Sequence, residues 1–279
     1  KKTMVIDGKY FAYRTRYSKG FSDLEFNDIA TGIYYGFFLA IQSLAKHIKP
    51  DKTIICWDLG TKSVRRDLFP EYKIKKFTKE LSTEEHHLNE VFKTEYLNLV
   101  RICGDIGFKG NSVLGFESDD VMAKYCLDHP DEEVYVCTKD EDLYQCISEN
   151  VIFFDPDKKK KKDLNWFKKE YGIEPENWVD VKKIAGCKSD CVPGIVGIGE
   201  KRALQYITNT ATDTIKNKIE SEPNILKRNY ELVKLPHPKF PEKMEYYESK
   251  LDMDAFISFC QTYGMKHFLE NLHDFEIFE

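Results

Sequence analysis

The sequence TMVID, residues 3–7, is a short apolar run that ends in an aspartate. The same pattern recurs in TIICWD, residues 53–58, and in EVYVCTKDED, residues 133–142. Short apolar runs of this kind predict buried strands, and their alternation with helical patterns predicts a parallel α/β sheet. The aspartates that follow the runs are Asp7, Asp58, Asp140 and Asp142. Because functional groups of such a sheet collect at the carboxyl ends of its strands, we expect these side chains in one crevice.

The rest of the chain continues this alternation and then becomes helical. Periodic apolar residues predict a helix over residues 29–48. Further helices are predicted over 85–103, 116–128 and 140–147, and further strands over 107–111 and 151–154. We therefore expect an α/β domain over residues 1–175, with an insertion over about 60–88, and a helical subdomain over residues 176–279.

A fourth acidic cluster opens one of the predicted helices. FESDD, residues 116–120, carries Glu117, Asp119 and Asp120. Any one of the acids in these clusters has an ordinary alternative role as a helix N-cap, but three at one cap exceed that need. Carboxylates gathered in one crevice repel each other unless cations lie between them, and oxygen ligands suit Mg²⁺ or Mn²⁺ better than Zn²⁺. The sequence therefore predicts a Mg²⁺-dependent phosphoryl-transfer site.

Composition narrows the class of protein further. With 42% hydrophobic residues among 279, the chain is globular, and no apolar stretch is long enough to cross a bilayer or to form a signal peptide. The eight cysteines show no zinc-ligand spacing, which favours a reducing cytosol. The net charge of −5 argues against nucleic-acid binding, but Lys and Arg concentrate in 62–79 and 158–169, away from the acids.

Two basic segments each allow two interpretations. The long segment between Asp58 and Glu84 interleaves Lys and Arg with aromatic residues, which indicates a functional insertion at the mouth of the site or, alternatively, a solvated loop. The run Lys158–Lys162 follows a predicted strand and a turn. It is interpreted as a solvated hairpin tip, with contact to a duplex backbone as the alternative.

A glycine-rich motif, GCKSDCVPGIVGIGEKRA, covers residues 186–203. Its glycines Gly194, Gly197 and Gly199 allow close approach of the backbone to a phosphate, and Lys201 and Arg202 open the next predicted helix. The motif does not follow a strand within a βαβ unit, so it is a poor dinucleotide signal. It predicts a hairpin between helices that holds a nucleic-acid backbone, with an ordinary helix connection as the alternative.

Several stretches together resemble the 5′ nuclease, or flap endonuclease, family, which includes short phage enzymes and the 5′ nuclease domain of bacterial DNA polymerase I. The matching stretches are VIDGKYFAYR (5–14), WDLGTKSVRRDLFPEYKIKK (57–76), GFESDD (115–120), CTKDEDLYQ (137–145) and IAGCKSDCVPGIVGIGEKRA (184–203). The resemblance implies a PIN-like 5′ nuclease fold: a central, mainly parallel sheet with a helical arch and a helix–three-turn–helix module.

The resemblance also implies roles for individual residues. The first metal ion would be held by Asp7, Asp58, Glu117 and Asp119, and the second by or near Asp120, Asp140, Asp142 and Asp190. Lys73 would contact the scissile phosphate, and Asp7, Asp58 and Asp119 complete the predicted catalytic set. Contacts to nucleic acid are expected from Arg14, Arg65, Tyr72, Lys73, Lys76, Gly194, Gly197, Gly199, Lys201 and Arg202. The hairpin of such enzymes often binds K⁺. The resemblance also implies the cytoplasm of a bacterial cell or of a phage-infected host.

The chain departs from the family pattern at one predicted ligand. Gly186-Cys187-Lys188-Ser189-Asp190-Cys191 stands where the family has GDxxDN, so that Cys187 replaces a carboxylate. Because a thiolate is a soft ligand, the second ion should bind more weakly or favour Mn²⁺.

The sequence thus predicts a structure-specific 5′ nuclease, both flap endonuclease and 5′-3′ exonuclease, that uses two Mg²⁺ or Mn²⁺ ions. Its expected substrate is branched or nicked DNA with a 5′ single-stranded arm, with RNA-primed DNA as a further one. A monomer is expected, with any polymerase partner on another chain. The alternatives are a catalytically weak binding protein on the same scaffold and a Mg²⁺ phosphotransferase or phosphatase for a small substrate. The latter would not need the glycine hairpin or the basic insertion.

Overall fold

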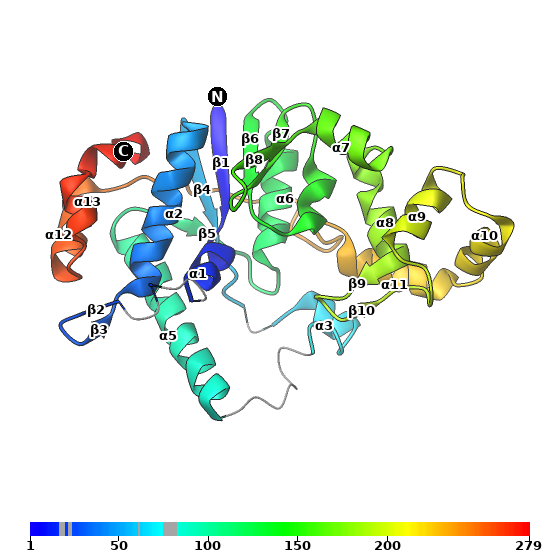
Figure 1. Ribbon diagram of the computed structural model, residues 1–279, viewed down its shortest axis with the longest axis horizontal. Helices are drawn as coiled ribbons and strands as arrows, with labels where there is room; N and C mark the ends of the chain where they lie inside the picture. Colours follow the sequence, from blue (N-terminus) through cyan, green and yellow to red (C-terminus); the bar gives the residue numbers. More distant parts are fainter. Residues whose placement is uncertain (17–19, 22–23, 61, 75–82) are drawn as a thin grey trace.

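The computed structural model describes residues 1–279 apart from 17–19, 22–23, 61 and 75–82 (Figure 1). Its centre is a six-stranded sheet of order β5-β4-β1-β6-β7-β8, in which only β8 runs antiparallel to its neighbour. The strands are β1 Lys2–Asp7, β4 Lys52–Cys56, β5 Gly110–Asn111, β6 Glu133–Cys137, β7 Val151–Asp155 and β8 Lys160–Lys162. Two small antiparallel pairs join β2 Glu25–Phe26 with β3 Ile29–Ala30, and β9 Gly186–Cys187 with β10 Val192–Pro193.

The register of the sheet brings the acidic strand ends to one edge. Asp7 of β1 is paired with Cys56 of β4, and Ile6 is paired with Cys137 of β6. Asp58 therefore follows just beyond the end of β4, and Asp140 just beyond the end of β6. The expected crevice at the carboxyl ends of the strands is confirmed as the place where these chain segments meet.

Alternating side chains of the strands feed two hydrophobic cores. Met4 and Ile6 of β1 point to the face covered by α2, whereas Val5 points to the face covered by α6. The main helices are α1 Gly8–Arg16, α2 Gly32–Ile48, α3 Val64–Leu68, α5 Thr83–Asp105, α6 Ser118–Asp128, α7 Leu164–Tyr171, α8 Trp178–Ala185, α9 Glu200–Ile207, α10 Asp213–Glu220, α11 Pro223–Val233, α12 Met253–Thr262 and α13 Lys266–Glu270. The 3₁₀ helices are η1 Glu141–Cys146, η2 Pro175–Asn177, η3 Leu272–Asp274 and η4 Glu276–Phe278. This is the expected α/β fold with helices on both faces of a mostly parallel sheet.

Local details differ from the sequence predictions at three places. Helix α1, which begins directly after the acidic end of β1, was not expected from the sequence. The helix predicted to begin at residue 29 begins at Gly32, because residues 29–30 pair with β2 across a two-residue turn. That turn places Asn27 and Asp28 at positive φ, as a tight hairpin requires. The helix predicted over 140–147 is the shorter 3₁₀ turn η1.

The C-terminal helices pack with the α/β part of the molecule. Phe256 and Phe259 of α12 and Phe268 of α13 share one hydrophobic core with Phe38 of α2. Figure 1 shows α12 and α13 beside α2, whereas α8 to α11 lie at the opposite end of the sheet. We therefore propose a division in which α8 to α11 form the helical unit and residues 252–279 belong to the α/β domain, in place of a helical subdomain over 176–279.

The predicted insertion is described in part. Its first half contains α3 and a turn that ends at Ile74, and α5 resumes at Thr83. The middle of the expected arch, with Lys76, lies outside the described residues. None of the helices that the structure describes combines the length and apolar character needed to cross a membrane.

Candidate active site

Asp7 ties three elements together at the end of β1. Its Oδ1 accepts hydrogen bonds from the backbone N–H of Tyr10 (3.1 Å) and from Ser118 Oγ (3.3 Å), and its Oδ2 accepts one from Thr138 Oγ1 (3.1 Å). Burial raises the pKa of Asp7 in spite of these donors, and the nearby Asp58 charge adds to the effect. A carboxylate held in this way is fixed in orientation and favours a neighbouring cation.

Asp58 lies beside it and is half-buried. Lys9 Nζ lies 2.6 Å from Asp58 Oδ2, and Tyr96 Oη donates a hydrogen bond to the backbone carbonyl of Asp58 at 3.1 Å. Lys9 thus supplies the only ion pair that Asp58 makes among the described residues. Lys9 was not among the residues expected from the sequence, although its place two residues after Asp7 puts it at the same edge.

Glu117 joins the basic insertion to the start of α6. Lys73 Nζ lies 2.6 Å from Glu117 Oε1, and Tyr72 Oη donates to Glu117 Oε2 at 2.8 Å. The same two residues reach Asp190, with Tyr72 Oη 3.2 Å and Lys73 Nζ 3.7 Å from its carboxylate. Burial alone would raise the pKa of Glu117, but the Lys73 and Arg65 charges lower it to about 2.

The insertion therefore closes onto the acidic crevice. Burial acts to lower the pKa of Lys73, but Glu117 and Asp190 outweigh it and raise that pKa, so Lys73 stays cationic. Tyr72 is only 2% exposed and packs with Val179 and Leu232. Because the Tyr72 ring is buried, it presents no free face for the expected contact with nucleic acid, and its hydroxyl instead holds Glu117 and Asp190.

A buried ion pair accounts for two residues that were given other roles. Arg65, 1% exposed, donates to both carboxylate oxygens of Asp120, at 2.5 and 2.8 Å, and to the Leu232 carbonyl at 2.8 Å. Asp120, fully buried, also accepts a hydrogen bond from the backbone N–H of His237 at 2.8 Å. Both side chains are thus enclosed and satisfied by each other. We correct the assignment of Arg65 as a nucleic-acid contact and of Asp120 as a metal ligand, because neither group is accessible.

Asp119 remains available in the crevice. Burial, followed by the Asp120 and Glu117 charges, raises the pKa of Asp119, and Arg65 and Lys73 offset this only in part. The carboxylate therefore lies in an electrostatic environment that a bound cation would relieve. Asp7, Asp58, Glu117 and Asp119 together offer oxygen atoms only, which fits a hard divalent ion.

A second group of donors lies where the η1 turn meets the β9–β10 hairpin. Donor atoms of Asp142, Cys187 and Asp190 lie within 4.8 Å of one another. Asp140 caps η1 by accepting a hydrogen bond from the backbone N–H of Asp142 at 2.9 Å. Desolvation and then the Asp142 and Asp190 charges raise the pKa of Asp140 to about 7. These residues could hold a second ion, but the set contains a thiol.

Lys182 of α8 is a cation of this second group that sequence reasoning missed. Its Nζ lies 3.1 Å from Asp142 Oδ1 and 3.1 Å from Glu200 Oε1, and the residue is 8% exposed. Burial acts to lower the pKa of Lys182, but both carboxylates outweigh it and raise that pKa. There was little reason in the sequence to select Lys182 as a site residue, because in WVDVKKIAG it is one of two adjacent lysines on a short helix.

The glycine-rich motif forms the predicted connection between two helices. It joins α8 to α9 through the β9–β10 pair and the turn at residues 194–198. A Cβ at Gly194 would lie 2.1 Å from the Ala185 carbonyl oxygen, so only glycine fits there, and Gly197 has φ +75°. Val196 at the tip is 81% exposed. Lys201 and Arg202 are exposed at the start of α9, and Arg202 donates to the Gly197 carbonyl at 2.6 Å.

Arg14 lies on α1, away from the metal-ligand candidates. Its Nε lies 3.2 Å from Asp157 Oδ1, in the turn between β7 and β8. The structure therefore brings the carboxylates, Tyr72 and Lys73 into one crevice, places the glycine hairpin beside it, and separates Arg14 from it.

Comparison with known proteins agrees with this geometry. The family model described as "5'-3' exonuclease, N-terminal resolvase-like domain" matches residues 2–172. The chain is 28% identical over 265 residues to a 5'-3' exonuclease of Buchnera aphidicola subsp. Schizaphis graminum, covering 92% of this chain and 88% of that protein. It is 31% identical over 224 residues to a 5'-3' exonuclease of Mycoplasmopsis pulmonis, covering 79% and 71%. It also matches thermostable DNA polymerase I of Thermus filiformis, at 29% identity, but spans only 27% of that protein.

Solved structures share the fold. T5 5'-exonuclease with divalent metal ions (zinc) bound has a TM-score of 0.72 at 22% identity, covering 99% of both chains. Flap endonuclease-1 of Methanococcus jannaschii has a TM-score of 0.57 at 17% identity, covering 94% of this chain and 86% of that one.

Fold and site together define a metal-dependent nuclease built on a PIN-like α/β sheet. The chain belongs to the 5'-3' exonuclease family. The expected family and enzyme class are confirmed, and the alternative of a catalytically weak binding protein is not favoured, since the named relatives are exonucleases.

Proposed function

We propose that this protein cleaves DNA next to junctions between single-stranded and double-stranded segments, as a flap endonuclease and 5′-3′ exonuclease. The observation that carries the proposal is the contact of Tyr72 and Lys73, from the insertion, with Glu117 and Asp190 in the acidic crevice. A strand that reaches the crevice must pass this insertion. Cleavage position is then set by the shape of the DNA and not by its sequence.

The donor sets differ in how well they fit Mg²⁺. Asp7, Asp58, Glu117 and Asp119 present carboxylate oxygens alone, which suits Mg²⁺ or Mn²⁺. In the second group, the thiol of Cys187 does not suit Mg²⁺, so that ion would depend on Asp140, Asp142 and Asp190 and bind more weakly. We propose Mg²⁺ as the main cofactor, with Mn²⁺ favoured where the second ion limits the rate.

The residues of the chain have separate tasks in the reaction. When bound, divalent ions supply an ionised water and neutralise charge on the phosphate. Tyr10, Ser118 and Thr138 donate hydrogen bonds to Asp7 and fix the position of its carboxylate oxygens. The carboxylate therefore does not have to reorient during the reaction. Lys73 keeps its positive charge, and it would be able to donate to a phosphate oxygen if Glu117 were held by a bound ion instead. Tyr72 holds the Lys73 backbone against the crevice.

The glycine hairpin is proposed to hold the duplex. Its exposed tip at Val196, followed by Lys201 and Arg202 on α9, presents backbone and cations without side chains that read bases. We propose K⁺ as a ligand of the hairpin carbonyls, and binding that weakens steeply with salt. We also propose RNA-primed DNA as a further substrate, a monomeric state and a polymerase partner on another chain.

The test is cleavage of a 5′-labelled flap duplex, titrated with Mg²⁺ and with Mn²⁺. Asp119→Asn should abolish cleavage near the junction, because it removes one ligand of the first group, while leaving duplex binding in EDTA intact. Asp131→Asn, an exposed aspartate in the loop before β6, is the matched control and should cleave normally. Wild-type rates from Asp119→Asn would show that the assignment of the crevice is wrong.

A further inference from the structure

Lys9 lies in the acidic crevice, and the proposed reaction gives it no task. It is the second residue of α1, and its Nζ lies 2.6 Å from Asp58 Oδ2. The start of α1 is fixed against the segment that carries Asp58, because a Cβ at Gly8 would lie 2.3 Å from the Trp57 ring. Only glycine allows this close approach, and the residue that follows it is thereby brought beside Asp58.

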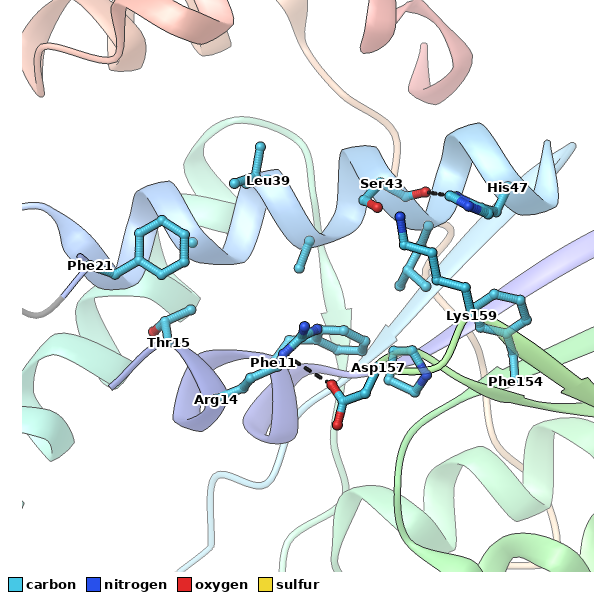
Figure 2. Close-up of a pocket in the computed structure, with 14 residues that line it drawn as sticks. Phe11, Arg14, Thr15, Phe21, Leu39, Ser43, His47, Phe154, Asp157 and Lys159 are labelled. Carbon is cyan, nitrogen blue, oxygen red and sulfur yellow. Dashed lines mark hydrogen bonds and ion pairs between the residues drawn. The ribbon is translucent and has the colours of Figure 1, made fainter. Parts of the chain in front are cut away.

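A second cation of α1 points elsewhere. Figure 2 shows Arg14 turned toward Asp157, beside a cavity of about 310 Å³ between α1, α2 and the β7–β8 hairpin. Arg14 Nε lies 3.2 Å from Asp157 Oδ1, and this ion pair holds the guanidinium away from the metal-ligand candidates. Of these two cations, Lys9 is therefore the one that faces the carboxylates of the crevice.

Two of the candidate ligands of the first ion are paired with a lysine, but the two ion pairs differ in exposure. The side chains of Lys73 and Glu117 are 17% and 14% exposed, whereas those of Lys9 and Asp58 are 47% and 19% exposed. Water screens an exposed pair, and a long side chain loses entropy when it is held, so such a pair contributes little to stability. Lys9 is therefore the more easily displaced of the two lysines.

A divalent ion bound at Asp58 would act directly against Lys9. Burial raises the pKa of Asp7, and the Asp58 charge adds to this, so the two carboxylates are close enough to act on each other and to share an ion. A divalent ion carries twice the charge of an ammonium group and becomes the largest local charge of the site. It therefore replaces Lys9 as the group that neutralises Asp58, and it repels the ammonium group.

We propose that Lys9 neutralises Asp58 in the metal-free protein, is displaced by the metal ion, and then contacts the phosphate that enters the crevice. Lysine suits such an exchange, because it carries a compact charge on a flexible four-carbon stem. Among the residues that the structure describes, Lys9 makes no ion pair with a second carboxylate that would retain it. The contact with the phosphate rests on the proposed nuclease function, whereas the displacement by an ion does not.

The exchange has two consequences of opposite sign. Removing the Lys9 charge should strengthen the binding of the ion, because the ion no longer competes with an ammonium group for Asp58. The same change should slow cleavage at saturating ion concentration, because one charge-assisted hydrogen bond to the phosphate is lost. A lysine that only stabilised the fold around Asp58 would not give tighter ion binding together with a slower reaction.

The experiment compares the wild type with Lys9→Gln in two measurements. In a calorimetric titration with Mg²⁺ and no DNA, the dissociation constant of the tighter ion should fall roughly two- to fivefold, the size expected for one exposed ion pair. In single-turnover cleavage of the flap duplex at saturating Mg²⁺, the rate should fall about tenfold. Lys9→Arg keeps the charge and the donor, and it should restore wild-type behaviour in both measurements.

Lys46→Gln is the matched control. Lys46 Nζ lies 2.7 Å from Asp274 Oδ2, and the two side chains are 54% and 11% exposed, so this pair resembles that of Lys9 and Asp58 but lies outside the crevice. Its loss should change neither the dissociation constant for Mg²⁺ nor the cleavage rate. Duplex affinity in EDTA should be the same for the wild type and for all three variants, because Lys9 is engaged by Asp58 when no ion is bound.

The proposal fails in any of three ways. An unchanged or weaker affinity of Lys9→Gln for Mg²⁺ would show that the ion does not displace Lys9. An unchanged cleavage rate at saturating Mg²⁺ would show that Lys9 does not contact the phosphate. Equal effects of Lys46→Gln, or weaker duplex binding by Lys9→Gln in EDTA, would show general charge attraction. A wild type that binds Mg²⁺ but does not cleave would instead refute the nuclease function, and the titration without DNA would still decide whether Lys9 is displaced.

Discussion

The two halves of the acidic crevice are built by different means. The first half rests on the ends of β1 and β4 and on the start of α6, and its central carboxylate, Asp7, is held by three hydrogen bonds. The second half rests on η1 and on the β9–β10 hairpin, and it contains a thiol and a buried lysine, Cys187 and Lys182. One half offers oxygen ligands on rigid strands, and the other mixes hard and soft donors with a fixed cation.

This difference indicates where divergence within such a site is tolerated. Replacing any carboxylate of the first half leaves a buried hydrogen-bonded arrangement incomplete, which is costly. In the second half, the Lys182 ammonium already offsets part of the charge on Asp142, so loss of one carboxylate is less damaging. We infer that catalysis in this chain depends mainly on the first half.

The largest expected effect comes from a direct comparison of one carboxylate substitution in each half of the crevice. Asp7→Asn should lower the single-turnover rate of flap cleavage by about a thousandfold, because an orienting ligand of the better-fitting ion is lost. Asp142→Asn should lower it by only about tenfold. Single-turnover rates at saturating Mg²⁺ measure both, with circular dichroism as the control for folding. Equal losses would mean that both halves contribute alike.

The next effect concerns the residue that bridges the halves. Lys73→Ala should lower the single-turnover rate about a hundredfold, as expected for the loss of one donor to a developing charge. Duplex affinity, measured by fluorescence anisotropy in EDTA, should change less than threefold, since the glycine hairpin is untouched. Arg66→Ala, a change to another basic residue of the same insertion, serves as the comparison. If rate and affinity fell together, Lys73 would be a binding residue and not a catalytic one.

A smaller effect should follow from restoring a carboxylate to the second half. Cys187→Asp should lower the Mg²⁺ concentration needed for half-maximal cleavage by about tenfold and reduce the preference for Mn²⁺. Cys187→Ser separates removal of the thiol from addition of the charge, and Cys191→Ser controls for a nearby cysteine outside the donor set. An unchanged Mg²⁺ requirement in Cys187→Asp would place residue 187 outside the metal site.

Sequence reasoning reached most of this arrangement, because strand ends are marked locally. The runs that end at Asp7 and Asp58 and the cluster at Glu117 could be placed in one crevice from the rules of parallel sheets. The glycine motif was likewise recognisable, since the close approach at Gly194 excludes any other residue. The family resemblance added the connection to Lys73.

What the sequence missed depends on contacts between distant segments. Arg65 and Asp120 each carried a functional signal, yet they neutralise each other across 55 residues in a buried pair. Lys182 gave only a weak signal because its partner Asp142 is 40 residues away, and the packing of α12 on α2 depends on segments far apart in the chain. A charged residue in a motif is predicted to have an electrostatic partner. Only the tertiary structure shows whether that partner is a ligand or another side chain.

The smallest expected effect is a dependence of stability on pH that arises in the second half. The pKa of Asp140 is about 7 in the folded chain and 3.8 when unfolded, so the folded state binds more protons. Its contribution to stability is therefore present at pH 4 and is lost as the pH rises through 7. Glu117, with a lowered pKa, changes its contribution to stability only below pH 4.5.

Asp140→Asn mimics the protonated form and should match the wild type at pH 5 but melt higher at pH 8 in EDTA. Because the Asp140 side chain is exposed and its charge is screened by solvent, the gain should be about 2 °C, measured by calorimetry. Added Mg²⁺ should abolish that gain, since an ion bound to the wild type offsets the same repulsion. A gain of equal size at pH 5 and pH 8 would show that charge in the second half is not what destabilises the metal-free protein.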